Sequence, residues 1–164
     1  IENELRRVSA PLVRSGGLPP NQVEYKLRRM VNDYLQPPKA TRKMHLAQER
    51  FAEIREDINN IPAENPHELM RAMEIQVIHD CARMAAHASL YREDSRWGLY
   101  HYPVDFPERN DAEWFTHCHL KKDGEDGMTS FKKPVEPYLF PLDDDEKKAY
   151  QRLRVVRQAQ GAKA

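Results

Sequence analysis

The sequence predicts a mainly α protein. We expect an up-down-up three-helix bundle of the spectrin-repeat type, then an extended segment with a small β-hairpin and a short C-terminal helix. Three observations predict this fold: apolar residues recur at helical spacing in three stretches between residues 21 and 92, prolines separate the stretches, and the helical spacing ends beyond residue 92. With 164 residues, the chain is long enough for one domain with a hydrophobic core.

The first helix is expected to begin at Asn21, a favourable N-cap residue that Glu24 follows in a capping-box pattern. Pro37 and Pro38 end it, because proline removes a backbone donor and clashes with the preceding turn. Its apolar stripe is Val23, Leu27, Met30 and Tyr34.

The second helix has the clearest periodicity, and Pro62 ends it. Its apolar residues are spaced alternately three and four apart, as in the seam of an antiparallel bundle: Met44, Ala47, Phe51, Ile54, Ile58 and Ile61.

Three start signals open the third helix: Asn65 as N-cap, Pro66 at the first helical position and Glu68 at the third. The helix is expected to run to about Tyr91, and small alanines along it would let a neighbouring helix approach closely. Its predicted core stripe is Met70, Met73, Val77, Cys81, Met84 and Ala88.

Residues beyond the third helix change in character. Arg92 to Asp111 is predicted as a loop, and Trp114 to Lys121 alternate as in a half-buried strand. Residues 122–127 have turn composition, and residues 128–135 are the expected return strand of the hairpin. An acidic start at residues 143–146 and arginines at 152, 154 and 157 predict a last helix whose charges suit the helix dipole.

Composition excludes several classes of function. The chain has 26 basic and 26 acidic residues, so its charge gives no reason to expect a nucleic acid partner. No apolar run approaches the roughly 20 residues that span a bilayer, so direct membrane insertion is not expected. No secretory signal opens the chain, and its two cysteines fit a reduced, cytoplasmic protein. Because the chain begins with Ile1 rather than Met, we expect a processed product or a piece of a longer protein.

Catalytic and ligand-binding motifs are absent from the sequence. His117 and His119 flank Cys118 in the predicted strand, and neighbouring side chains of a strand point to opposite faces, so the three do not form one metal site. Cys81 is interpreted as a buried core thiol, and Ser95 lacks a positioned base. With no glycine-rich phosphate loop, the sequence predicts no catalytic, cofactor-binding or metal-binding residue in this chain. The methionines at 30, 70, 73 and 84 are assigned to core packing.

One segment after the third helix is unusually rich in arginine, aromatic residues and carboxylates. Guanidinium–carboxylate pairs and arginine–aromatic stacking can lock an irregular loop onto its own bundle, and tryptophan, tyrosine and arginine also anchor protein interfaces. Both roles are compatible, and both remain open at this point. The candidate interface or structural residues are Arg96, Trp97, Tyr100, Asp105, Arg109, Asp111 and Trp114.

The same segment resembles the C-terminal signature of the flavoprotein subunits of succinate dehydrogenase, fumarate reductase and adenylylsulfate reductase. The resemblance covers residues from about 20 to 140 and rests on Ser95-Arg96, Asp105-Phe106-Pro107-Glu108-Arg109-Asn110-Asp111 and Trp114. Three further segments look closer to the adenylylsulfate reductase branch: His67-Glu68-Leu69-Met70-Arg71-Ala72, Tyr91-Arg92-Glu93-Asp94-Ser95-Arg96-Trp97 and Phe131-Lys132-Lys133-Pro134-Val135.

This resemblance implies a non-catalytic C-terminal domain of an FAD-dependent oxidoreductase whose FAD domain lies upstream. The implied partners are that FAD-binding domain and an iron–sulfur subunit, and the implied location is the cytoplasm or the inner face of a membrane. The implied division is a linker at 1–20, the bundle at 21–92, a docking segment at 93–142 and a helix with a tail at 143–164. The implied parent substrate is a dicarboxylate or a sulfur oxyanion.

Two other classes of protein compete with this interpretation. The first is a free-standing three-helix-bundle module that binds a partner helix, which a start codon near Ile1 would favour. The second is a small metalloenzyme, against which the spacing of histidine and cysteine argues.

Overall fold

The computed structural model describes residues 1–96, 98–124, 127–135 and 144–145. The chain divides into two units, residues 1–133 and 134–164, and the description below concerns the first. In chain order its elements are α1 (Glu2–Ser9), η1 (Ala10–Val13), α2 (Pro20–Leu35), α3 (Thr41–Asn59), α4 (Pro66–Tyr91), η2 (Gly98–Tyr100), α5 (Asp111–Trp114), β1 (Thr116–Asp123) and β2 (Gly127–Pro134), the last reaching one residue into the second unit.

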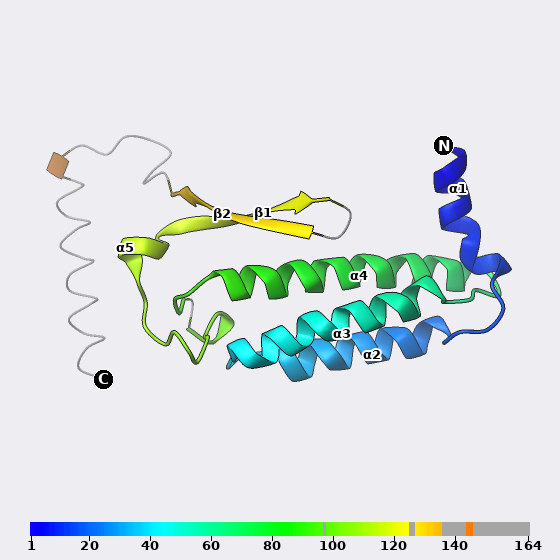
Figure 1. The fold of residues 1–164 in the computed structure, drawn as a ribbon, viewed down its shortest axis with the longest axis horizontal. Helices are drawn as coiled ribbons and strands as arrows, with labels where there is room; N and C mark the ends of the chain where they lie inside the picture. The colour runs from blue at the N-terminus through cyan, green and yellow to red at the C-terminus, as the bar shows by residue number, and fades with distance from the viewer. Residues whose placement is uncertain (97, 125–126, 136–143, 146–164) are drawn as a thin grey trace. The chain divides into compact units, whose positions relative to one another are not determined.

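Helices α2, α3 and α4 pack side by side as a three-helix bundle, and β1 and β2 form a two-stranded hairpin that lies along α4 (Figure 1). The mainly α fold with a bundle and a small hairpin is therefore confirmed. The predicted C-terminal helix lies outside the described residues, except for residues 144 and 145. The segment predicted as a linker contains α1 and η1, and its role as a link to an upstream domain stays a prediction.

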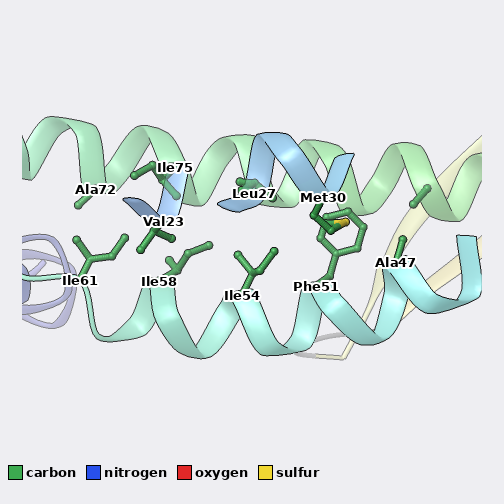
Figure 2. Packing of buried hydrophobic residues seen from close by; sticks show 11 residues of the cluster. Val23, Leu27, Met30, Ala47, Phe51, Ile54, Ile58, Ile61, Ala72 and Ile75 are labelled. Atoms are coloured by element: carbon green, nitrogen blue, oxygen red, sulfur yellow. The ribbon is translucent and has the colours of Figure 1, made fainter. Parts of the chain in front are cut away.

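The bundle core confirms the predicted stripes of α2 and α3. Figure 2 shows these side chains pointing toward one another from the facing helices. The members from α2 and α3 and from the residue after α3 are Val23, Leu27, Met30, Ala47, Phe51, Ile54, Ile58 and Ile61, all of them buried. Tyr34 packs half-buried at the edge of this cluster.

Helix α4 presents a different face to the core from the one predicted. Its buried residues are Ala72, Ile75, His79 and Ala86, whereas Met70, Val77 and Met84 are 55%, 63% and 43% exposed. Cys81 is exposed too, so its assignment as a buried thiol is wrong, as is the assignment of Met70 and Met84 to the core.

The face of α4 in the core is the one that contacts the large side chains of α3. Large side chains of α3, among them Phe51 and Ile54, fill the space between the helices. The face of α4 that meets them carries Ile75 and His79, and His79 gains there a hydrogen-bond contact with the Phe51 carbonyl oxygen and an edge-to-face contact with the Phe51 ring. Met73 of the predicted stripe packs half-buried against this cluster.

Helix starts were predicted with mixed success. Asn65 Oδ1 accepts a hydrogen bond from the Glu68 N–H at 3.0 Å, which confirms the start of α4. The prediction for Asn21 is wrong, because α2 already begins at Pro20. Proline suits the first helical position, since its φ is preset and its missing N–H would have no partner there. Glu24 instead pairs with Arg28 at 2.7 Å and with Arg71 of α4 at 2.9 Å.

The core also contains one polar ring, that of His79. Its Nε2 lies 2.9 Å from the carbonyl oxygen of Phe51, and the ring meets the Phe51 ring edge to face. Burial lowers the pKa of His79, because the imidazolium would lose its hydration in the core.

We expect acidification to destabilise the bundle through His79. In the unfolded chain His79 titrates near pH 6.5, whereas in the folded chain its pKa is lower. The contribution of neutral His79 to the free energy of unfolding is therefore complete above about pH 6.5. It is lost as the pH falls toward the pKa of His79 in the folded chain. Urea unfolding at pH 7.5 and 5.0 should give a smaller fall in the free energy of unfolding for His79→Gln than for the natural chain. The exposed His45→Gln serves as control, and an unchanged pH dependence in His79→Gln would contradict the assignment.

Candidate functional site

The loop after α4 is tied to the connection between α2 and α3. The N–H of Lys39 donates to the carbonyl oxygen of Tyr102 at 2.8 Å, and the N–H of Val104 donates to the carbonyl oxygen of Lys39 at 2.8 Å. Asp105 accepts a hydrogen bond from the backbone N–H of Thr41 at 2.8 Å, which caps the start of α3. Its hydrogen bonds to Thr41 lower the pKa of Asp105. This predicted site residue thus joins the loop to the bundle.

At the centre of the loop lies the carboxylate of Asp94, which is completely buried. Arg92 Nε lies 2.8 Å from Asp94 Oδ1, and Arg96 Nε lies 2.7 Å from Asp94 Oδ2. A carboxylate is buried at acceptable cost only when it is paired. The two guanidinium groups provide that pairing from both sides.

The ion pairs continue toward α5. Arg96 contacts Asp111 at 2.8 Å, and Arg109 contacts the same carboxylate oxygen at 2.8 Å. Three predicted residues, Arg96, Arg109 and Asp111, therefore come together. Asp94 and Arg92 were not among the predicted residues, although the alternation of Arg92, Asp94 and Arg96 directly after a helix could have indicated them.

Trp114 is a buried anchor at the end of α5. Its ring meets the Tyr91 ring edge to face at 5.7 Å, and Lys132 Nζ of β2 lies 3.4 Å from the ring centroid. Arg92 donates to the carbonyl oxygen of Trp114 at 2.5 Å, and its guanidinium carbon lies 5.7 Å from the ring centroid. Cation–π contacts of this kind gain strength when the cation is withdrawn from water. Trp114 therefore fastens both α4 and the hairpin.

The hairpin has two different faces. Arg92 reaches the carbonyl oxygen of Thr116 at 3.3 Å and Cys118 Sγ at 3.1 Å on one side. His119 stacks on Phe131 with ring centroids 5.3 Å apart, and the His117 ring lies 6.2 Å from that of His119. Alternate residues of a strand share a face, so these two histidines belong to the side opposite Cys118.

The predicted site residues fall into two groups. Arg96, Asp111 and Trp114 are inside the locked loop, with side chains at most about a tenth exposed, whereas Tyr100 is 85% exposed and Arg109 and Asp105 lie at the surface. Trp97 lies outside the described residues. Within the described ranges, no group of three or more histidine, cysteine, aspartate or glutamate side chains could hold a metal ion.

Two basic side chains beside the loop are half-buried or buried. Lys39 Nζ donates to Ser89 Oγ at 2.8 Å, and burial lowers the pKa of this lysine. Burial, with Lys39 nearby, also lowers the pKa of His101. These polar contacts add to the ion pairs and to the ring contacts of Trp114 that hold the loop in place. Tyr100 is left exposed on it.

A three-helix bundle, a loop held by ion pairs and a hairpin define a mainly helical domain. Residues 24–152 match the family model for the C-terminal domain of fumarate reductase flavoproteins, and the chain belongs to this family. The family comprises C-terminal domains of flavoprotein oxidoreductases, including those of succinate dehydrogenase, fumarate reductase and adenylylsulfate reductase, as the sequence resemblance implied.

Solved structures share this fold. Adenylylsulfate reductase from Archaeoglobus fulgidus is 26% identical, with a TM-score of 0.79 over 86% of this chain and 25% of that chain. The Mycobacterium smegmatis Sdh1 complex is 21% identical, with a TM-score of 0.71 over 85% of this chain and 24% of that chain. The E. coli quinol fumarate reductase FrdA is 15% identical, with a TM-score of 0.74 over 85% and 25%.

The chain therefore spans about a quarter of the length of these structures. No curated protein sequence matches it. Among the described residues, no helix combines the length and the apolar character needed to cross a bilayer.

Replacement of the central carboxylate should unlock the loop. Asp94→Ala leaves the buried Arg92 without a counter-charge and leaves Arg96 with Asp111 alone. We expect it to lower the free energy of unfolding by about 3–5 kcal/mol. Limited proteolysis should then cut between residues 95 and 115 first. Asp33→Ala removes an exposed ion pair with Arg29 and should cost less than about 1 kcal/mol. Equal effects of the two variants, by urea unfolding, would contradict the lock.

Proposed function

We propose that this chain is the non-catalytic C-terminal domain of an FAD-dependent oxidoreductase of the succinate dehydrogenase and fumarate reductase type. It packs on the FAD-binding domain of its parent and helps to dock an iron–sulfur subunit. The observation that carries the proposal is the family match over residues 24–152, together with coverage of only a quarter of each neighbouring structure. On this proposal the flavin, the substrate and the redox chemistry belong to the remainder of the parent.

The division of labour within the chain follows from the burial of its residues. The bundle supplies a rigid support, and the Asp94 ion pairs hold the loop and hairpin against α4. Tyr100 and the stacked His119 and Phe131 supply accessible aromatic surface. Aromatic side chains are frequent anchors of protein interfaces. We therefore assign the docking role to the accessible aromatic side chains of the 93–142 segment, which are Tyr100, His119 and Phe131. We assign a structural role to Arg96, Asp111 and Trp114.

Adenylylsulfate reductase is the favoured type of parent. The identity of 26% to the Archaeoglobus fulgidus enzyme exceeds the 21% and 15% to the other two structures, and it agrees with the motifs around residues 67–72 and 91–97. The favoured substrate class is accordingly a sulfur oxyanion, with a dicarboxylate as the second candidate. We place the parent in the cytoplasm, with peripheral association at the inner face of a membrane as a variant.

Purification of the full gene product from its native host tests the proposal. We expect a yellow polypeptide of several times this length, which carries FAD and retains an iron–sulfur protein that elemental analysis detects. Activity should then be assayed with adenylylsulfate, succinate and fumarate. A colourless product of about 164 residues would overturn the proposal and favour a free-standing interaction module.

The isolated chain should not bind flavin. It has six glycines and no glycine-rich phosphate loop that could cradle the pyrophosphate of FAD. Titration of the purified chain with FAD should leave the flavin absorbance and fluorescence unchanged. Saturable quenching of FAD fluorescence by the chain would contradict the division of labour.

A further inference from the structure

Helix α4 carries a second apolar stripe that the bundle does not cover. It consists of Met70, Val77, Cys81 and Met84, all of them exposed. Val77 lies two residues from both Ile75 and His79 of the core, which is about 200° around the helix. The stripe therefore runs along the side of α4 opposite the core, for roughly 20 Å from residue 70 to residue 84.

No such stripe exists on the other long helices of the bundle. The exposed positions of α3 are mostly charged, among them Arg42, Lys43, Glu49, Glu53 and Glu56. A helix with one apolar face suits the surface of a protein, whereas a helix that is apolar on opposite faces is usually enclosed on both. Of these helices, α4 is thus the one that is apolar on two opposite sides, and one of the two is exposed.

The hairpin does not close this surface. Strand β1 packs along α4, yet Met84, Cys81 and Val77 keep their exposure with the hairpin in place. At the chain's N-terminal end, Arg7 of α1 reaches the Gln76 side chain at 3.1 Å, and Val77 beside it is still 63% exposed. The described residues of the chain therefore leave the stripe uncovered.

We infer that the stripe Met70–Val77–Cys81–Met84 is the surface on which the flavin-binding part of the same polypeptide packs. This inference rests on the proposed function and names the surface that it requires. The occupant follows from length, because the neighbouring structures with this fold have chains about four times as long as the region they share with this one. A covalently joined domain meets this surface at a high effective concentration, so a smaller apolar contact is needed than between two separate chains.

The reactivity of the Cys81 thiol shows whether the stripe is covered, because Cys81 lies within the stripe and is exposed in this chain. The experiment labels the full gene product and the 164-residue chain with N-ethylmaleimide and follows Cys81 by peptide mass spectrometry. We expect labelling to be at least about tenfold slower in the full gene product, since a thiol reacts only where the reagent can reach it. An Ala52→Cys variant is the control, because Ala52 is exposed on α3 and its labelling should be equally fast in both proteins.

Three outcomes would overturn the inference. Equal labelling of Cys81 in both proteins, with FAD bound to the longer one, would leave the proposed function intact and remove the stripe as its interface. Protection of Cys81 in the 164-residue chain that grows with concentration would identify a second copy as the occupant. Protection that appears only when a separate subunit is bound would assign the stripe to that subunit.

A charge introduced into the stripe gives an independent test. Val77→Glu should leave the thermal unfolding of the 164-residue chain unchanged, because Val77 is exposed there. In the full gene product it should speed proteolytic release of this domain, since a buried glutamate without a partner is unfavourable. Ala52→Glu, also at an exposed apolar position, should change neither protein. Equal release from the Val77→Glu and Ala52→Glu proteins would overturn the inference.

Discussion

The buried carboxylate of Asp94 is the constraint on which the structure after the bundle depends. Arg92 and Arg96 contact it from two sides, and each then reaches further along the chain. Arg92 contacts the carbonyl oxygens of Trp114 and Thr116, whereas Arg96 contacts Asp111. Because an unpaired buried charge is very unfavourable, one arrangement of these side chains is strongly preferred over others. That arrangement sets the path of the loop and the start of the hairpin.

The bundle itself depends on the contact between α3 and one face of α4. Phe51 on α3 meets the His79 ring of α4 edge to face, and its carbonyl oxygen lies 2.9 Å from His79 Nε2. Toward the other end of the cluster, Ala72 and Ile75 of α4 point toward Ile61 (Figure 2). The opposite side of α4, with Met70, Val77 and Met84, is left outside the bundle. On the function proposed above, this exposed side is the surface through which the domain joins the rest of its parent. The core and the proposed contact would then lie on opposite sides of one helix.

Local signals predicted the parts of the fold that local chemistry controls. The stripes of α2 and α3 were predictable because only one apolar face is present on each, and the start of α4 was predictable because Asn65 caps it through its own side chain. The choice between two apolar faces of α4 was not, since Met70 and Ile75 are equally suited to a core until the neighbouring helix is known. The start of α2 was also ambiguous from the sequence, because Pro20 and Asn21 are adjacent and both favour a helix start, and the helix begins at Pro20.

The sequence by itself determined the family, the helical class, the candidate segment and its residue types, because these follow from periodicity, turn composition and a motif that is contiguous in the chain. Only the tertiary structure decided which of the charged residues are internal. Arg96 and Asp111 are 15 residues apart in sequence and become partners only when the loop folds back, and Asp94 gains its role only by being enclosed. Burial and pairing depend on what lies nearby in space, and that is a property of the whole fold rather than of any segment.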